Sequence, residues 1–237
     1  MVSQNDSNPP PKGKKPTGSD PSPSDIEYVQ ESLNAEYRAL FDKAVGLGKA
    51  GDLQGAAELA RKAIKASEAK GGTHEASVIL TFLPALFPGA PLSEFRKAAY
   101  RAVDLLDGRA HCEYLLSHAR FYTMQVELRA DLKAAALKEA KACVIAGKAS
   151  RTHCNWLSST WRYYGLLLAH TGDLNQAVLA ISNAIDLAES HPTDDQFALA
   201  KALEAMGRTL IEMGQIALGE ESIKRSKIEF QKHGRTG

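Results

Sequence analysis

Apolar positions in this chain recur at helical spacing from residue 26 to residue 232. They follow one another at intervals of three and four residues, and alanine, leucine, glutamate and lysine dominate the region. Such spacing gathers apolar side chains on one face of a helix. Alternating β-branched runs bounded by turn dipeptides, which would predict strands, are missing from the sequence. We therefore predict an all-α fold.

The sequence also repeats itself. Residues 110–132 match residues 152–174, so the interval is 42 residues. In this frame Arg120 aligns with Arg162. The match covers aromatic, small and charged positions alike, which indicates a duplicated unit and not a shared composition.

The same frame extends over five units of about 40 residues. An expected turn falls, at intervals of 39, 40, 42 and 42 residues, at Asp52, Pro91, Asp131, Asp173 and Gln215. Five residues before each turn stands an aliphatic residue: Leu47, Leu86, Val126, Leu168 and Leu210. Eleven residues after each turn stands a small one: Ala63, Ala102, Ala142, Ala184 and Ser226. This pattern predicts five helical hairpins stacked into an α-solenoid, with close helix contacts at the small residues.

The repeat resembles the tetratricopeptide repeat. In the fourth unit the matching residues are Trp161, Tyr164, Gly165, Leu168, Gly172, Asp173, Ala177, Ala184 and Pro192. The long units are similar to the repeats of kinesin light chains and of bacterial signal-responsive regulators. The resemblance implies a right-handed solenoid that binds other proteins on the concave face lined by the first helix of each unit. Phe95 and Glu139 depart from the pattern, at positions where alanine and an apolar residue are usual.

The N-terminal residues differ in composition from the repeats. Residues 1–25 hold six of the ten prolines and almost no large apolar side chains. Such a segment cannot bury enough apolar surface to offset the entropy of ordering. We predict a disordered proline-rich tail over residues 1–25, a helical repeat domain over 26–232 and a flexible C-terminus over 233–237. The sequence shows neither a signal peptide nor a membrane span, so we expect a cytoplasmic protein.

Charge and cysteine content narrow the function. Lysine and arginine number 29 against 28 acidic residues, and this balance argues against a nucleic-acid partner. The pairs His111-Cys112 and His153-Cys154 occupy equivalent repeat positions and raise the alternative of bound zinc. Adjacent helical residues diverge by about 100°, which disfavours it. We find no catalytic motif, and we predict no enzyme activity, no cofactor and no metal; an enzyme or a zinc protein is the less favoured alternative.

The concave face supplies the candidate binding groove. Its predicted residues are Arg38, Phe41, Lys49, Leu80, Phe87, Arg120, Met124, Glu127, Arg162, Leu166, Lys201 and Arg208. The N-terminal end is apolar, whereas Arg120 and Arg162 stand in register at a basic centre. Guanidinium groups bind carboxylates through two hydrogen bonds. The groove therefore predicts a partner peptide that is acidic in its middle and has an apolar anchor. The alternative is that these arginines pair with Glu127 and Glu204 on the same face.

We therefore predict a scaffold or adaptor for protein–protein interaction. The alternative function is a regulatory sensor domain gated by a small signal or a peptide, which would require a pocket that closes around the ligand. Homo-oligomerisation stays open, because residues 215–232 mix apolar and charged side chains.

Overall fold

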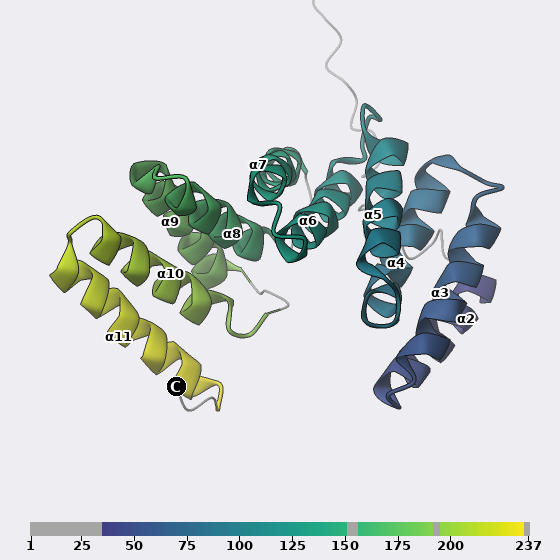
Figure 1. The fold of residues 1–237 in the computed structure, drawn as a ribbon, viewed down its shortest axis with the longest axis horizontal. Coiled ribbons are helices and arrows are strands. Elements are labelled where there is room, and N and C mark those ends of the chain that lie inside the picture. The colour runs from purple at the N-terminus through teal and green to yellow at the C-terminus, as the bar shows by residue number, and fades with distance from the viewer. Residues whose placement is uncertain (1–34, 151–155, 192–194, 235–237) are drawn as a thin grey trace, which may run out of the picture.

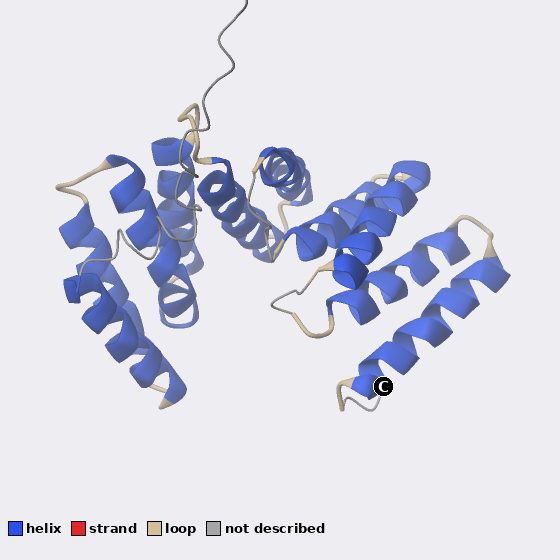
Figure 2. Cartoon of the chain, turned by 180° about the vertical axis from the view of Figure 1, so that it is seen from behind, coloured by secondary structure: helices blue, strands red, loops and turns tan. Residues whose placement is uncertain are grey.

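A computed structural model describes residues 35–150, 156–191 and 195–234. Within these ranges the chain forms ten helices and no strand (Figure 2). The helices are α2 (Ala35–Lys49), α3 (Leu53–Ser67), α4 (Gly72–Gly89), α5 (Leu92–Leu106), α6 (Glu113–Arg129), α7 (Lys133–Ala149), α8 (Leu157–His170), α9 (Leu174–Ser190), α10 (Ala198–Glu212) and α11 (Ile216–Lys232). The prediction of an all-α solenoid is confirmed.

The helices pair into five hairpins that follow one another along an arch, from α2 at one end to α11 at the other (Figure 1). Each helix packs against the next one in the chain, and first helices of neighbouring hairpins also meet: α2 with α4, α4 with α6, and α8 with α10. One face of the arch is thus built from first helices and the other from second helices. None of the described helices combines the length and the apolar character that a membrane span requires.

The turns within the hairpins follow from local chemistry. Gly51 and Gly172 have φ angles of 86° and 85°, a left-handed conformation that glycine adopts without strain. The next residue then caps the second helix: the Asp52 carboxylate accepts a hydrogen bond from the Gly55 amide at 2.8 Å, and Asp173 caps α9 in the same way. These turns lie where the sequence predicts them.

The third hairpin is offset by one residue from its predicted frame. Asp131 has a φ of 55° and takes the place that Gly172 holds in the fourth hairpin. The Leu132 amide bonds the Glu127 carbonyl at 2.9 Å, as the Asp173 amide bonds that of Leu168 at 3.0 Å. The third and fourth hairpins therefore correspond at an interval of 41 residues, although their sequences match at 42. The position before the turn that is aliphatic in the other hairpins is therefore occupied by Glu127, whereas the sequence predicted Val126 there.

The offset rotates every matched side chain of α6 by about 100° relative to α8. The Arg120 guanidinium donates to Glu139 of α7 at 2.8 Å, inside its own hairpin, whereas Arg162 stacks over Tyr163. The prediction that Arg120 and Arg162 stand in register is therefore wrong. Likewise Cys143, fully buried, replaces Ala142 at the small crossing position.

Small residues bring the helices together. Ala63, Ala102, Ala184 and Ser226 are buried, as the repeat predicts. One core cluster of buried apolar side chains runs from hairpin one into hairpin five. Phe95, which departs from the repeat pattern, is 1% exposed and fits because its ring meets other rings. The predicted tail over 1–25 and the domain start at residue 26 lie outside the described residues.

Candidate functional site

An aromatic cleft opens on the face built from first helices. It consists of two adjoining hollows of about 320 and 290 Å³ that share Phe121, Tyr122 and Gln125 of α6. The other lining residues are Pro84, Phe87, Phe95, His118, Arg129, Trp156, Ser159, Arg162, Tyr163, Asp195 and Lys201. The cleft thus spans three consecutive first helices, α4, α6 and α8, and reaches the start of α10.

Ring contacts join the two hollows into one surface. Phe87 meets Phe95 with centroids 5.1 Å apart, and Phe95 meets Tyr122 at 6.0 Å. Tyr122 in turn meets His118 at 4.9 Å, and His118 stacks on Trp156 at 4.2 Å with an interplanar angle of 13°. Edge-on and offset ring pairs of this kind hold one another in place. The cleft is therefore a rigid surface that is assembled before any partner arrives.

Trp156 fixes the end of the cleft at the start of α8. Its indole N–H donates to the Ser117 hydroxyl at 3.0 Å, and its ring meets Tyr114 edge-on at 4.9 Å. His118 is half-buried beside the stacked indole, and this burial lowers its pKa to about 4. His118 is therefore neutral at physiological pH and adds a planar, uncharged ring to the surface.

Two guanidinium groups lie over aromatic rings of the cleft. The guanidinium carbon of Arg129 is 3.3 Å from the Phe87 ring centroid, and that of Arg162 is 4.2 Å from the Tyr163 centroid. Both are cation–π geometries. Neither arginine has a carboxylate within ion-pair distance in the described part of the chain. Each keeps donors available for an incoming acid.

Phe87, Arg162 and Lys201 are the predicted groove residues that line the cleft. Lys201 is already engaged, since its ammonium donates to Asp195 at 2.6 Å. Burial acts to raise the pKa of Asp195, but the hydrogen bonds from Lys201 and from the Phe197 amide outweigh it and hold that pKa low. This pair is a fixed part of the wall.

Three predicted residues are packed inside, and a fourth is half-buried. Leu80, Met124 and Glu127 are 2%, 0% and 0% exposed, so none of them can contact a ligand, and their assignment to the groove is corrected. Leu166 is half-buried against the cluster around Ile181. Met124 and Glu127 are buried because of the one-residue offset of α6. The offset turns both side chains away from the open face and into the contacts between helices.

Arg120 and Arg208 pair within the chain. Arg120 donates to Glu139 at 2.8 Å, and Arg208 bonds Glu204 at 2.5 Å. The alternative of internal pairing therefore holds for both. For Arg208 the partner is the predicted one, whereas Glu127 binds Arg96 at 2.8 Å instead.

Arg38, Phe41 and Lys49 belong to the first hairpin, outside the cleft. Arg38 and Lys49 are exposed, and Phe41 packs edge-on against Phe82 at 5.7 Å. They stay predictions for a longer contact surface. His153 and Cys154, which belong to the less favoured zinc alternative, lie outside the described residues. Within the described ones no group of three or more potential metal ligands comes together.

Sequence reasoning missed Tyr122, Gln125 and Arg129. A signal existed, since seven of the sixteen aromatic residues fall within residues 114–122 and 156–164. The prediction aligned α6 with α8 at 42 residues, whereas the structures correspond at 41. It therefore assigned the wrong residues of α6 to the open face.

The sequence matches no protein-family model and no curated protein. Solved structures do resemble the fold. The apo form of RapI has a TM-score of 0.71 at 14% identity, over 84% of this chain and 71% of RapI. BtubC from P. vanneervenii has a TM-score of 0.68 at 13% identity, over 90% of this chain and 92% of BtubC. The repeats of a putative kinesin light chain from Podosopora anserina have a TM-score of 0.66 at 12% identity, over 84% of this chain and 96% of that structure.

The chain has a tetratricopeptide-like fold. Five long hairpins along one arch, together with these similarities, establish that architecture. At 12–14% identity the likeness concerns the fold alone. Function has to be argued from the aromatic cleft.

Proposed function

We propose that this solenoid is a cytoplasmic interaction scaffold, without enzymatic activity, that binds a segment of a partner protein in the aromatic cleft. The observation that carries the proposal is the continuous ring surface from Phe87 to Trp156. The guanidiniums of Arg129 and Arg162 flank it, and the charge of Arg162 also helps to lower the pKa of Asp195 in the same hollow. Aromatic and arginine side chains in a preformed hollow are the groups that dominate the energetics of protein interfaces.

The chemistry of the cleft favours an acidic segment with an apolar anchor. The ring surface offers burial for one large apolar side chain. Arg129 and Arg162 can each hold a carboxylate, because stacking on a ring orients the guanidinium and leaves its edge free. The proposal keeps the ligand predicted from the sequence but moves the basic contacts from Arg120 and Arg208 to Arg129 and Arg162.

A matched pair of double variants tests the proposal. Partners captured on the immobilised full chain are identified by mass spectrometry, and their affinities for each variant are then measured directly. We expect Arg129→Gln/Arg162→Gln to weaken binding by roughly tenfold or more, because hot-spot arginines are worth that much. Lys138→Gln/Lys141→Gln, which removes two exposed charges from α7, should bind like the wild type. Equal affinities of all three chains would place the partner elsewhere.

A further inference from the structure

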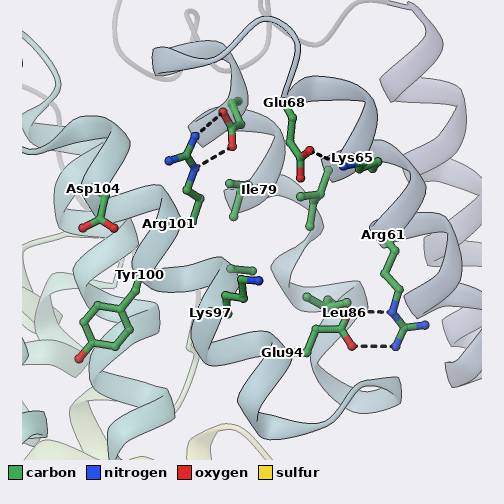
Figure 3. Close-up of a pocket in the computed structure, with 13 residues that line it drawn as sticks. Arg61, Lys65, Glu68, Ile79, Leu86, Glu94, Lys97, Tyr100, Arg101 and Asp104 are labelled. Atoms are coloured by element: carbon green, nitrogen blue, oxygen red, sulfur yellow. Dashed lines mark hydrogen bonds and ion pairs between the residues drawn. The ribbon is translucent and has the colours of Figure 1, made fainter.

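A larger hollow, the outer pocket, lies between α3 and α5 with α4 beneath it (Figure 3). Its volume is about 810 Å³. It shares no residue with the aromatic cleft, although α4 and α5 contribute residues to both. The lining residues used below are Arg61, Ile64, Ile79, Leu86, Glu94, Lys97, Ala98 and Arg101.

The floor of the outer pocket is apolar. Ile79 and Leu86 of α4 are almost fully buried beneath it, and Ile64 and Ala98 form its sides from α3 and α5. Charged side chains line the rim above this apolar floor, and the volume falls within the range of roughly 300 to 1,000 Å³ of sites for small organic ligands.

Ion pairs close both ends. At one end Arg61 of α3 reaches across to Glu94 of α5 with hydrogen bonds of 2.6 and 3.0 Å. At the other end Arg101 of α5 bonds both oxygens of the buried Glu75 at 3.0 and 3.3 Å. Glu94 and Arg101 are seven residues apart on one helix, which sets a span of about 10 Å between the ends. The pocket therefore fits a short ligand and not a long helix.

Lys97 and Asp104 are the charged lining residues of this space that form no ion pair within the described part of the chain. Lys97 lies on α5 between the two ion pairs, as Figure 3 shows, whereas Asp104 lies one helical turn beyond Arg101. The cations at either end already hold carboxylates, and Lys65 pairs with Glu68 at 2.8 Å. A negative group entering beside Lys97 would thus meet a free ammonium above an apolar floor.

We propose that the outer pocket binds a small organic carboxylate, with the carboxylate on Lys97 and an apolar body over Ile64, Ile79, Leu86 and Ala98. The site goes beyond the proposed partner cleft, since it shares no residue with that cleft and takes another class of ligand. Because α3 belongs to the first hairpin and α4 and α5 to the second, an occupied pocket fastens the two hairpins together. This gives the alternative of a sensor domain a structural basis.

The probe is sodium octanoate, with octylamine hydrochloride and octanol as matched cationic and neutral compounds. Calorimetric titration of the full chain should show saturable binding of one octanoate, and the melting temperature should rise with its concentration. Octylamine should bind at least tenfold more weakly, because it places a cation beside Lys97. Octanoate without saturable binding, or octylamine equal to it, overturns the proposal.

Two variants locate the site. Lys97→Met keeps the apolar stem and removes the charge; it should weaken octanoate binding by roughly 10- to 100-fold, the range of a charge-assisted hydrogen bond. Ala98→Leu should weaken binding, because it adds a branched side chain to the wall that the apolar body of the ligand covers. Lys62→Met, which removes an exposed charge of α3 that does not line the pocket, is the control and should bind as the wild type does. Full affinity in Lys97→Met with a normal circular dichroism spectrum overturns the assignment.

Discussion

Three buried carboxylates lie in the second and third hairpins. Glu75, Glu127 and Glu139 are at most 3% exposed, and each bonds one arginine: Arg101, Arg96 and Arg120 respectively. Leu168 stands in the fourth hairpin where Glu127 stands in the third. The centre of the arch thus replaces apolar contacts by ion pairs, which hold only while both partners are present.

Arg96→Met tests this dependence. It leaves the Glu127 carboxylate buried without its counter-charge, and one Glu127 oxygen already has no hydrogen-bond partner. We expect a loss of about 2 to 4 kcal/mol in the free energy of unfolding, measured by urea denaturation. Adding Glu127→Leu should recover most of the loss, because an apolar pair then fills the contact. A single variant as stable as the wild type would contradict the prediction.

His118 makes stability depend on pH. Burial lowers its pKa from 6.5 to about 4, so below pH 6.5 the unfolded chain takes up a proton that the folded chain refuses. The free energy of unfolding should therefore fall as the pH drops from 6.5 towards 4. His118→Phe, which keeps a ring on Trp156, should flatten this part of the profile. Burial also lowers the pKa of His74, so the free energy of unfolding of the variant should still fall somewhat as the pH drops.

At the scale of the helix, glycines decide how closely neighbours approach. A Cβ on Gly219 of α11 would lie 2.7 Å from the Gly207 carbonyl oxygen of α10 and 2.5 Å from Ile211. A Cβ on Gly46 of α2, by contrast, would have no neighbouring atom within 4 Å among the described residues. The same substitution therefore has opposite expected effects at the two sites.

Gly219→Ala should lower the free energy of unfolding by about 1 to 3 kcal/mol, the cost of forcing extra atoms into a closed contact. Gly46→Ala should raise it by roughly 0.5 to 1 kcal/mol, because alanine restricts the unfolded chain. Thermal melts of both variants against the wild type give the comparison. If both variants shift in the same direction, the close crossing of α10 and α11 is not as described.

Much of this element structure is predictable, because helices and turns are local. The five hairpins follow from spacing, and Gly51, Gly172 and their capping aspartates identify turns from a few residues. The aromatic cleft is less accessible, because the direction of a side chain depends on one residue of register. Arg129 contacts Phe87 of another hairpin, and the outer pocket needs three helices at once. No local motif reports such contacts.

At the scale of the whole molecule, α11 ends the stack by its chemistry. Val178 and Ile185 of α9 pack towards α10, in the cluster with Ala205 and Met206. Val178 and Ile185 stand five and twelve residues after Asp173, the cap of α9. The same distances from Gln215, the cap of α11, give Glu220 and Lys227, and both are exposed. Charged residues there leave no apolar face for another hairpin, as an end repeat requires.

Three large apolar side chains of α11 are exposed, at 49%, 61% and 47%: Ile216, Leu218 and Ile228. Their spacing does not place them on one face of the helix. We therefore expect the wild-type chain to run as a monomer in size-exclusion chromatography with light scattering. Glu220→Val/Lys227→Ile should restore the apolar face of α9 and produce concentration-dependent association. A monomeric double variant would show that other features end the stack.

The offset between the third and fourth hairpins has a consequence for the gene that encodes them. Two neighbouring copies of similar sequence invite unequal crossing-over, which joins them at aligned positions. Here such a crossover within α6 and α8 would yield a helix whose two halves face directions about 100° apart, because sequence and structure correspond at 42 and 41 residues. The recombinant hairpin could bury only half of its apolar face. A chain shortened by such a crossover should therefore be less stable than the parent chain.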